Sequence, residues 1–378
     1  MISRSENISV KSDTSSVTRK IQIKWPEILS LGSLHAAVAI SWIAYQEYQP
    51  LLVEKFQVVH LSQLLVFTKA LVLVFIPILA GWLADKIMVT RGKYFIVYMV
   101  GICATAMIFM IVASIITVGP NHPVASFLPI MIVLWLVSMS IFLSPAFSML
   151  ESFASSRNLP IAIGVIILIT DMIYALEPLV VLLVQFFGES LTFVVGAILV
   201  LGTGFVFNKV ASDEVMERQM QAQRVDQEDE NRITIIPILC IGALVGIGRA
   251  FLVEFIPGAS PLTALSGQQF AFVLLGISAL TAFGAGHYIS RQQIRHILPI
   301  CLIIMILGVA VLFFTTDYPA LFTTAGIMVA LSFGIAHMSS IPFVFSRVSV
   351  RHITFGIGAY LGTSALAEGI LEVFYAFH

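Results

Sequence analysis

Long apolar stretches separated by short polar segments constrain this chain more than any other feature of its sequence. Eleven stretches come close to the roughly 20 apolar residues that an α-helix needs to cross a bilayer. They lie at residues 27–49, 60–84, 94–118, 126–150, 160–186, 189–208, 233–256, 266–288, 296–316, 319–343 and 354–377. The hydrophobic content of 58% and the mean hydropathy of +0.99 exceed those of a soluble domain. The sequence therefore predicts an all-α integral membrane protein.

Lys and Arg residues fall almost entirely on one side of the predicted membrane. Of the 20 in the chain, 17 lie in the N-terminal tail or in loops that alternate spans place on the same side. Lys55 falls in a loop of the other side, and Lys69 and Arg249 lie inside spans. The positive-inside rule assigns the basic side to the cytoplasm. We expect a multi-pass protein of the plasma membrane (the inner membrane in a bacterium) with a cytoplasmic N-terminus and the lipid bilayer as a partner.

One long polar segment divides the predicted spans into six and five. Residues 209–232 lack Pro and Gly and are rich in acidic side chains. The predicted organisation is a cytoplasmic tail at 1–26, a six-helix bundle at 27–208, a cytoplasmic linker at 209–232 and a second bundle at 233–378.

Three sequence patterns recur in the same order in the two halves. They pair Glu47-Tyr-Gln-Pro50 with Glu254-Phe-Ile-Pro257, Gly81-Trp-Leu-Ala-Asp85-Lys86 with Gly286-His-Tyr-Ile-Ser290-Arg291, and the Arg157 to Gly164 segment with the Arg351 to Gly358 segment. Transporters commonly contain such duplicated units. We interpret the halves as pseudo-repeated helix bundles.

The segment between spans two and three resembles the signature of the major facilitator superfamily of secondary transporters. That signature is a Gly, three residues, an Asp, a basic residue and a short turn with Gly and further bases, and here it reads Gly81-Trp-Leu-Ala-Asp85-Lys86-Ile-Met-Val-Thr-Arg91-Gly92-Lys93. Two departures are a longer turn after Lys86 and eleven predicted spans where the family usually has twelve.

The resemblance implies two bundles around a central cavity lined by spans one, four, seven and ten. The bundles would rock about a midplane site to expose it alternately to either side. By the same resemblance, a cytoplasmic gate would involve Gly81, Asp85, Arg91, Gly92 and Arg157. Basic residues there also fix the topology, whatever else they do.

Charged residues inside spans are the strongest functional signal, since each costs at least about 2.5 kcal/mol at a span centre. Lys69 in span two and Glu368 in span eleven lie at similar depths, so we expect an ion pair between the bundles, either structural or functional. Candidates for proton coupling are Asp171, Glu177, Glu368 and Glu372. Asp171 leads because it is near mid-span without a basic neighbour in its own helix. Glu177 precedes Pro178 and is alternatively a residue of a helix kink.

Candidate substrate-binding residues lie on the spans that the resemblance places around the cavity. They are Arg249, Trp42, Tyr45, Gln46, His35 and His337. Arg249 is suited to holding an anion bidentately, or else it pairs with Glu254, Glu47 or Asp171. The aromatic residues otherwise belong to the interfacial belt. The histidines are either proton relays or are hydrogen-bonded within the bundle.

Sequence motifs of other functional classes are missing. The chain contains no Walker, HExxH or GxSxG sequence, and Cys103, Cys240 and Cys301 lack metal-site spacing. We therefore predict a non-enzymatic secondary transporter of a small polar or anionic solute, without cofactor, metal or nucleic acid. The coupling ion would be a proton or alternatively sodium. The alternatives are efflux of amphiphilic compounds and a membrane-embedded sensor or enzyme. No sequence feature indicates an oligomeric state.

Overall fold

The computed structural model describes residues 23–91, 95–155, 157–214, 216, 234–262, 265–289 and 291–377. Within these ranges all regular secondary structure is helical. Ten helices are long and apolar enough to cross a membrane, and a bent helix pair makes an eleventh span. The predicted all-α membrane protein is confirmed.

The helices follow the predicted spans with ends shifted by a few residues. The first half contains α1 (Trp25–Lys55), α2 (Ser62–Arg91), α3 (Phe95–Val118), α4 (Leu128–Ile141), α5 (Leu143–Ser148), α6 (Leu150–Phe153), α7 (Leu159–Ala175), α8 (Glu177–Phe187) and α9 (Glu189–Val210). The second half contains α11 (Ile235–Ala250), the π-helix η4 (Phe251–Phe255), α12 (Ile256–Ala259), α13 (Gly267–Tyr288), α14 (Arg291–Phe314), α15 (Pro319–Phe345), α16 (Ile353–Ser364) and α17 (Leu366–Phe377). Lys55, predicted in a loop, ends α1, because the helix continues through Pro50. Most of the predicted linker lies outside the described residues.

The fifth span is bent by 64° between α7 and α8. Pro178 occupies the first turn of α8, where it lacks an N–H and its ring cannot follow an uninterrupted helix. Glu177, the first residue of α8, therefore lies at the bend, as one of its two interpretations predicted.

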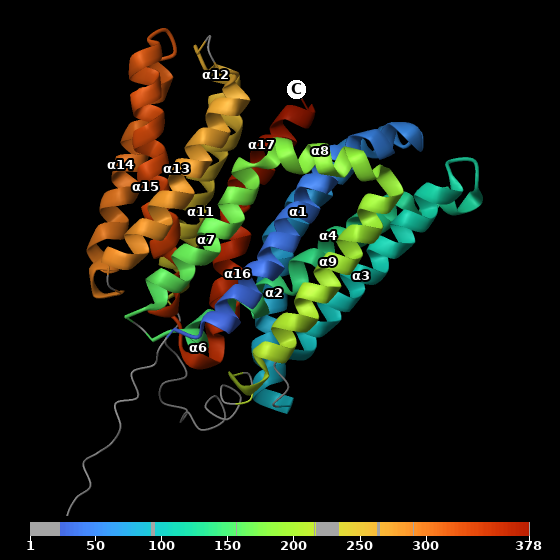
Figure 1. Ribbon diagram of the computed structural model, residues 1–378, viewed down its shortest axis with the longest axis horizontal. Coiled ribbons are helices and arrows are strands. Elements are labelled where there is room, and N and C mark those ends of the chain that lie inside the picture. Colours follow the sequence, from blue (N-terminus) through green and yellow to red (C-terminus); the bar gives the residue numbers. More distant parts are fainter. Residues whose placement is uncertain are drawn as a thin grey trace, which may run out of the picture.

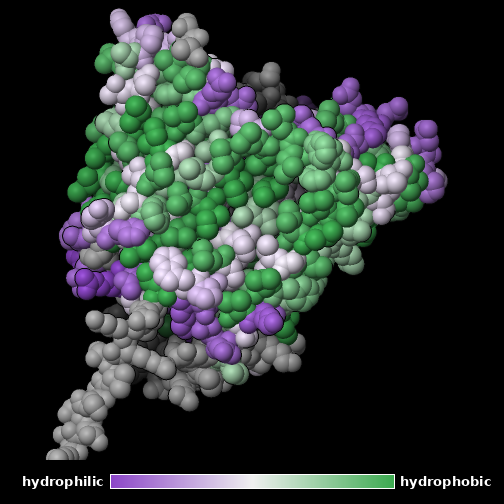
Figure 2. Space-filling view, in the orientation of Figure 1, coloured by the Kyte–Doolittle hydropathy of each residue, from purple (hydrophilic) through white to green (hydrophobic). Residues whose placement is uncertain are grey.

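The helices form two groups that diverge toward the end of the molecule at which the C-terminus lies (Figure 1). In the first group α1 packs on α7 and α9, and in the second α15 packs on α13 and α14. We call the side at which α1 begins, predicted to be cytoplasmic, the N side, and the other the far side. Figure 2 shows a broad hydrophobic surface across the middle of one face, with hydrophilic residues gathered toward its ends. This is the surface that a bilayer requires.

Four glycines matched by the sequence repeat lie where the bundles touch near the N side. A Cβ atom on Gly286 would lie 2.7 Å from the Pro160 carbonyl oxygen, and one on Gly164 would lie 2.9 Å from that of Ala282. The equivalent residues Gly81 and Gly358 face backbone carbonyls of Thr354 and Pro77 in the same way. Helix α2 therefore crosses α16 as α13 crosses α7, which is the pseudo-symmetric arrangement that the repeat predicted.

Candidate functional site

A cavity of about 520 Å³ lies between the two bundles. It is lined by residues of α1, α2, α4, α5, α7, α8, α11, η4, α12, α13, α15, α16 and α17. On α1 (Trp25–Lys55) the lining begins at His35 and reaches Gln46 toward the far side. In the seventh span it begins at Val245 and ends at Pro257. The cavity therefore extends from the middle of the membrane to the far side.

The N side of the cavity is sealed by contacts between the bundles. The Asp85 carboxylate in α2 accepts hydrogen bonds from the backbone N–H groups of Thr354 (3.3 Å) and Phe355 (2.7 Å), in the first turn of α16. The first turn of a helix offers N–H groups to partners outside its own ladder, and a helix N-terminus favours a negative charge. Asp85 thus bridges the bundles beside Gly81, whose lack of a side chain lets the Thr354 backbone approach.

The other predicted gate residues are less defined by the structure. Arg157 is exposed in the turn before α7. The Arg91 side chain and Gly92 lie outside the described residues. The role of these three residues at the gate stays a prediction.

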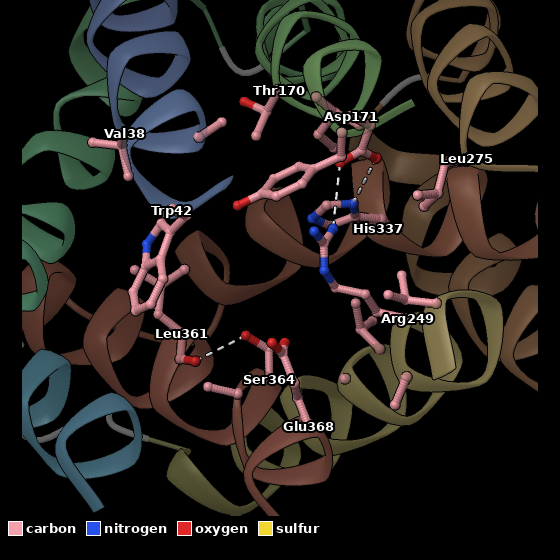
Figure 3. A pocket seen from close by; sticks show the side chains of 18 of the residues that line it. Val38, Trp42, Thr170, Asp171, Arg249, Leu275, His337, Leu361, Ser364 and Glu368 are labelled. Carbon is pink, nitrogen blue, oxygen red and sulfur yellow. Dashed lines mark hydrogen bonds and ion pairs between the residues drawn. The ribbon is translucent and has the colours of Figure 1, made fainter. Parts of the chain in front are cut away.

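A charged cluster joins the two bundles at the cavity wall (Figure 3). Arg249 Nη1 of α11 lies 3.5 Å from Asp171 Oδ1 of α7, and His337 Nδ1 of α15 lies 3.7 Å from Asp171 Oδ2. The Arg249 guanidinium also lies over the Tyr174 ring, 4.6 Å from its centroid. Of the partners that the sequence left open for Arg249, the structure selects Asp171. Asp171 is only 1% exposed, and its basic neighbour Arg249 comes from the opposite bundle.

A single π-helical turn places a second charged side chain in the cavity. The π-helix η4, Phe251–Phe255, follows Arg249 directly and contains Glu254. Residues five apart are about 140° apart around an α-helix, and the wider turn of a π-helix reduces that angle. Both Arg249 and Glu254 consequently line the cavity.

Comparisons with known proteins identify the architecture. No protein-family model matches the chain, and no curated protein matches it in sequence. Among solved structures, the human organic anion transporter MFSD10 (TETRAN) superposes with a TM-score of 0.64 at 10% identity, covering 93% of each chain. The proton:xylose symporter XylE, bound to 6-bromo-6-deoxy-D-glucose, superposes with a TM-score of 0.61 at 12% identity, covering 94% of this chain and 88% of XylE. The chain has the major facilitator superfamily fold.

An ion pair joins spans two and eleven, but Lys69 pairs with a different acidic residue from the predicted one. Lys69 Nζ lies 2.5 Å from the Glu372 carboxylate, not beside Glu368, so the predicted Lys69–Glu368 pair is wrong. Gly369 packs against Ala70 and defines the face of α17 that meets α2. On an α-helix, Glu372 lies about 60° around the axis from Gly369, and Glu368 lies about 100° from Gly369. Glu368 therefore turns into the cavity, which it lines.

We expect the Lys69–Glu372 pair to stabilise the contact between the bundles. The two side chains are 9% and 24% exposed, so Lys69→Ala leaves a half-buried carboxylate without its partner. The expected loss is about 1–3 kcal/mol, between the values for surface and buried pairs. Thermal unfolding in detergent measures the loss. The exchange of Lys69→Glu with Glu372→Lys should recover part of it, and Glu368→Gln should leave stability near native. A larger loss from Glu368→Gln than from Glu372→Gln would contradict this assignment.

The predicted binding residues of α1 separate onto two faces of the helix. His35, Trp42 and Gln46 line the cavity. Tyr45 does not, because it is rotated about 100° from Gln46 and points into the first bundle. There it stacks on Trp135, with ring centroids 4.7 Å apart, and is 4% exposed. The structure therefore contradicts the predicted substrate contact of Tyr45.

The other predicted binding and coupling residues also separate into those that line the cavity and one that does not. Arg249, His337, Glu177 and Glu368 line it, whereas Glu372 is turned to Lys69. The sequence indicated Glu254 only as a possible partner of Arg249, and Tyr174 was not among the predicted residues. The spacing of Asp171 and Tyr174, three residues apart on one helix face, was the available signal for Tyr174.

Proposed function

We propose that the protein is a secondary active transporter, not an enzyme, which moves a small polar solute by alternating access with the proton as coupling ion. The observation that carries this proposal is the cavity between two bundles, sealed at the N side and extending to the far side, with Asp171 and Arg249 paired across it. Both of the solved proteins that the chain resembles in fold are transporters, which supports the proposal. The distribution of Lys and Arg supports a plasma-membrane location with a cytoplasmic N-terminus.

Asp171 is the proposed coupling residue, and His337 its route to water. Asp171 Oδ2 has no hydrogen-bond partner among the described residues and is buried from solvent. His337 lies 3.7 Å away, and its side chain is 21% exposed at the cavity wall. A histidine at this position can take a proton from cavity water on one ring nitrogen and pass one on from the other.

Protonation of Asp171 would remove its ion pair with Arg249, which joins the two bundles. A neutral carboxyl no longer attracts the Arg249 guanidinium, so the two bundles lose an attraction that crosses their interface. Tyr174 and Tyr360 also interact electrostatically with Asp171, and a tyrosine hydroxyl is ordinarily uncharged at neutral pH. The charge state of Asp171 therefore biases the relative position of the bundles.

An anionic solute is the second candidate. Arg249 points into the cavity, and its contact with Asp171 is long at 3.5 Å (Figure 3). A solute carboxylate could take the place of Asp171 once that residue is protonated, because guanidinium binds carboxylates bidentately.

The proposal is tested by proton flux in liposomes that contain the purified protein and a pH-sensitive dye. The panel comprises sugars, carboxylates, amines and amphiphilic drugs, with each solute added in sodium-free buffer. We expect at least one solute to drive proton movement. Asp171→Asn should abolish solute-driven flux, since the amide cannot exchange a proton at this site.

Asp317→Asn is the matched control, because Asp317 is exposed in the loop before α15 and lies outside the cavity. It should transport like the native protein. Flux that appears only when sodium is added would replace the proton by sodium as the coupling ion. Unchanged proton flux in Asp171→Asn would rule out Asp171 as the coupling residue.

A further inference from the structure

The charges that line the cavity are predominantly acidic. Among the described residues, the lining contains the four carboxylates of Asp171, Glu177, Glu254 and Glu368 and the single guanidinium of Arg249. Arg249 is already paired with Asp171. With both histidines neutral, the lining carries a formal charge of −3.

The three remaining carboxylates have no counter-ion of their own. Within the described residues, none of Glu177, Glu254 and Glu368 forms a hydrogen bond or an ion pair within 4.0 Å. Unpaired carboxylates at membrane depth are costly and favour a cation beside them. Lys69, which interacts electrostatically with Glu254, is held by Glu372.

The carboxylates of Glu254 and Glu368 both line the cavity and interact with each other electrostatically. They come from η4 and α17 of the same bundle, and each lies within the electrostatic range of the other. Glu368 also interacts electrostatically with Arg249 and Tyr174. Figure 3 shows its carboxylate pointing into the space beneath Arg249. A cation placed there would be attracted by two carboxylates at once.

The opposite wall presents groups suited to the body of an organic molecule. Trp42 and Phe147 of the first bundle line the cavity. His35, only 4% exposed, also lines the cavity, and its Nε2 has no hydrogen-bond partner among the described residues. An unpartnered buried nitrogen is costly unless a ligand or water meets it. A volume of about 520 Å³ is in the usual range for an organic ligand.

We infer that the transported solute is an organic cation whose ammonium group is held by Glu254 and Glu368 and whose apolar body lies against Trp42 and Phe147. This inference rests on the proposed function, because it names the solute class of the same cavity. It also assigns binding roles to Glu254, which the sequence left without one, and to Glu368.

Equilibrium binding to purified protein tests this inference without requiring transport. The probes are matched sets that share a body and differ in one group: 2-phenylethylamine, 2-phenylethanol and 3-phenylpropionate, with the corresponding naphthyl and adamantyl sets. Displacement of the best-bound member in radiolabelled form reports the affinity. For at least one body we expect the amine to bind about tenfold or more tightly than the alcohol and the acid.

Glu368→Gln and Glu254→Gln should each weaken amine binding about tenfold and leave alcohol binding unchanged. Glu54→Gln is the matched control, because Glu54 is exposed at the far-side end of α1 and lies outside the cavity. Tighter binding of the acids, no binding of any amine, or amine binding that survives both cavity substitutions would overturn the inference.

The two proposals fail in different experiments. Proton flux driven by sugars or carboxylates, without amine binding, would retain the proposed transport and reject the organic cation. Amine binding that depends on Glu254 and Glu368, without solute-driven flux, would retain the cation site and reject proton-coupled transport.

Discussion

Replacing Gly286 with valine is expected to stop transport. A Cβ at this position would lie 2.7 Å from the Pro160 carbonyl oxygen, which belongs to the backbone of the opposite bundle and cannot move aside as a side chain can. Overpacking of this kind costs typically 1–3 kcal/mol. At the upper end of that range, about 3 kcal/mol, the state that is sealed at the N side becomes more than a hundredfold rarer relative to the state that is open there.

Solute uptake into liposomes measures the loss, and cysteine labelling shows its cause. Ser148 lies buried in the N-side seal beside Thr354, so Ser148→Cys in a background without the three native cysteines should react slowly with a maleimide. The Gly286→Val change should accelerate this labelling. Gly284→Val is the matched control on the same helix, because a Cβ on Gly284 meets nothing within 4 Å. Equal labelling rates in the Gly284 and Gly286 variants would contradict the proposed seal.

Replacing Arg249 with leucine is expected to cost about 3 kcal/mol of stability or more. Removal of one partner from a buried ion pair leaves the other charge without compensation, which typically costs 3–5 kcal/mol. The charge left behind is that of Asp171, which is 1% exposed and whose second oxygen already has no hydrogen-bond partner in the described part of the chain. Titration with a denaturing detergent, followed by tryptophan fluorescence, measures the free energy of unfolding.

The double variant Arg249→Leu with Asp171→Asn separates this charge effect from lost packing. It should be more stable than Arg249→Leu alone, because the buried carboxylate is gone. Arg295→Leu, at an exposed position near the N-side end of α14, controls for the loss of a positive charge and should change stability little. A double variant as unstable as the single one would mean that Arg249 acts through packing and not through its pair with Asp171.

The membrane-spanning architecture was predictable because insertion depends on local sums of residue hydrophobicity. A stretch such as residues 319–343 needs only its own apolar content to predict a span, and the structure has a helix at Pro319–Phe345. The repeat was predictable for a related reason. A helix crossing that requires backbone contact tolerates only a small residue, so Gly81, Gly164, Gly286 and Gly358 mark equivalent positions in the two halves.

The sequence indicated that charged residues inside the spans would pair with one another, but not which residues would form each pair. Depth along a span follows from the rise per residue, and it placed Lys69 near the acids of the last span. The choice between Glu368 and Glu372 depends on rotation of α17 after the break that ends α16, and no local pattern encodes that angle. Asp171 and Arg249 similarly meet across two bundles, 78 residues apart in the chain.

The number and kind of spans, the predicted orientation from the basic loops and the glycines at the crossings were thus open to prediction, because these properties follow from each segment's own composition. Tertiary structure alone decided which side chains share the cavity. Tyr45 turned toward Trp135, Glu368 turned inward, and a π-helical turn placed Glu254 in the cavity lining. The physical reason is that helix rotation, bends and π-turns are set by packing between segments far apart in the chain, and a few tens of degrees change a residue's neighbours.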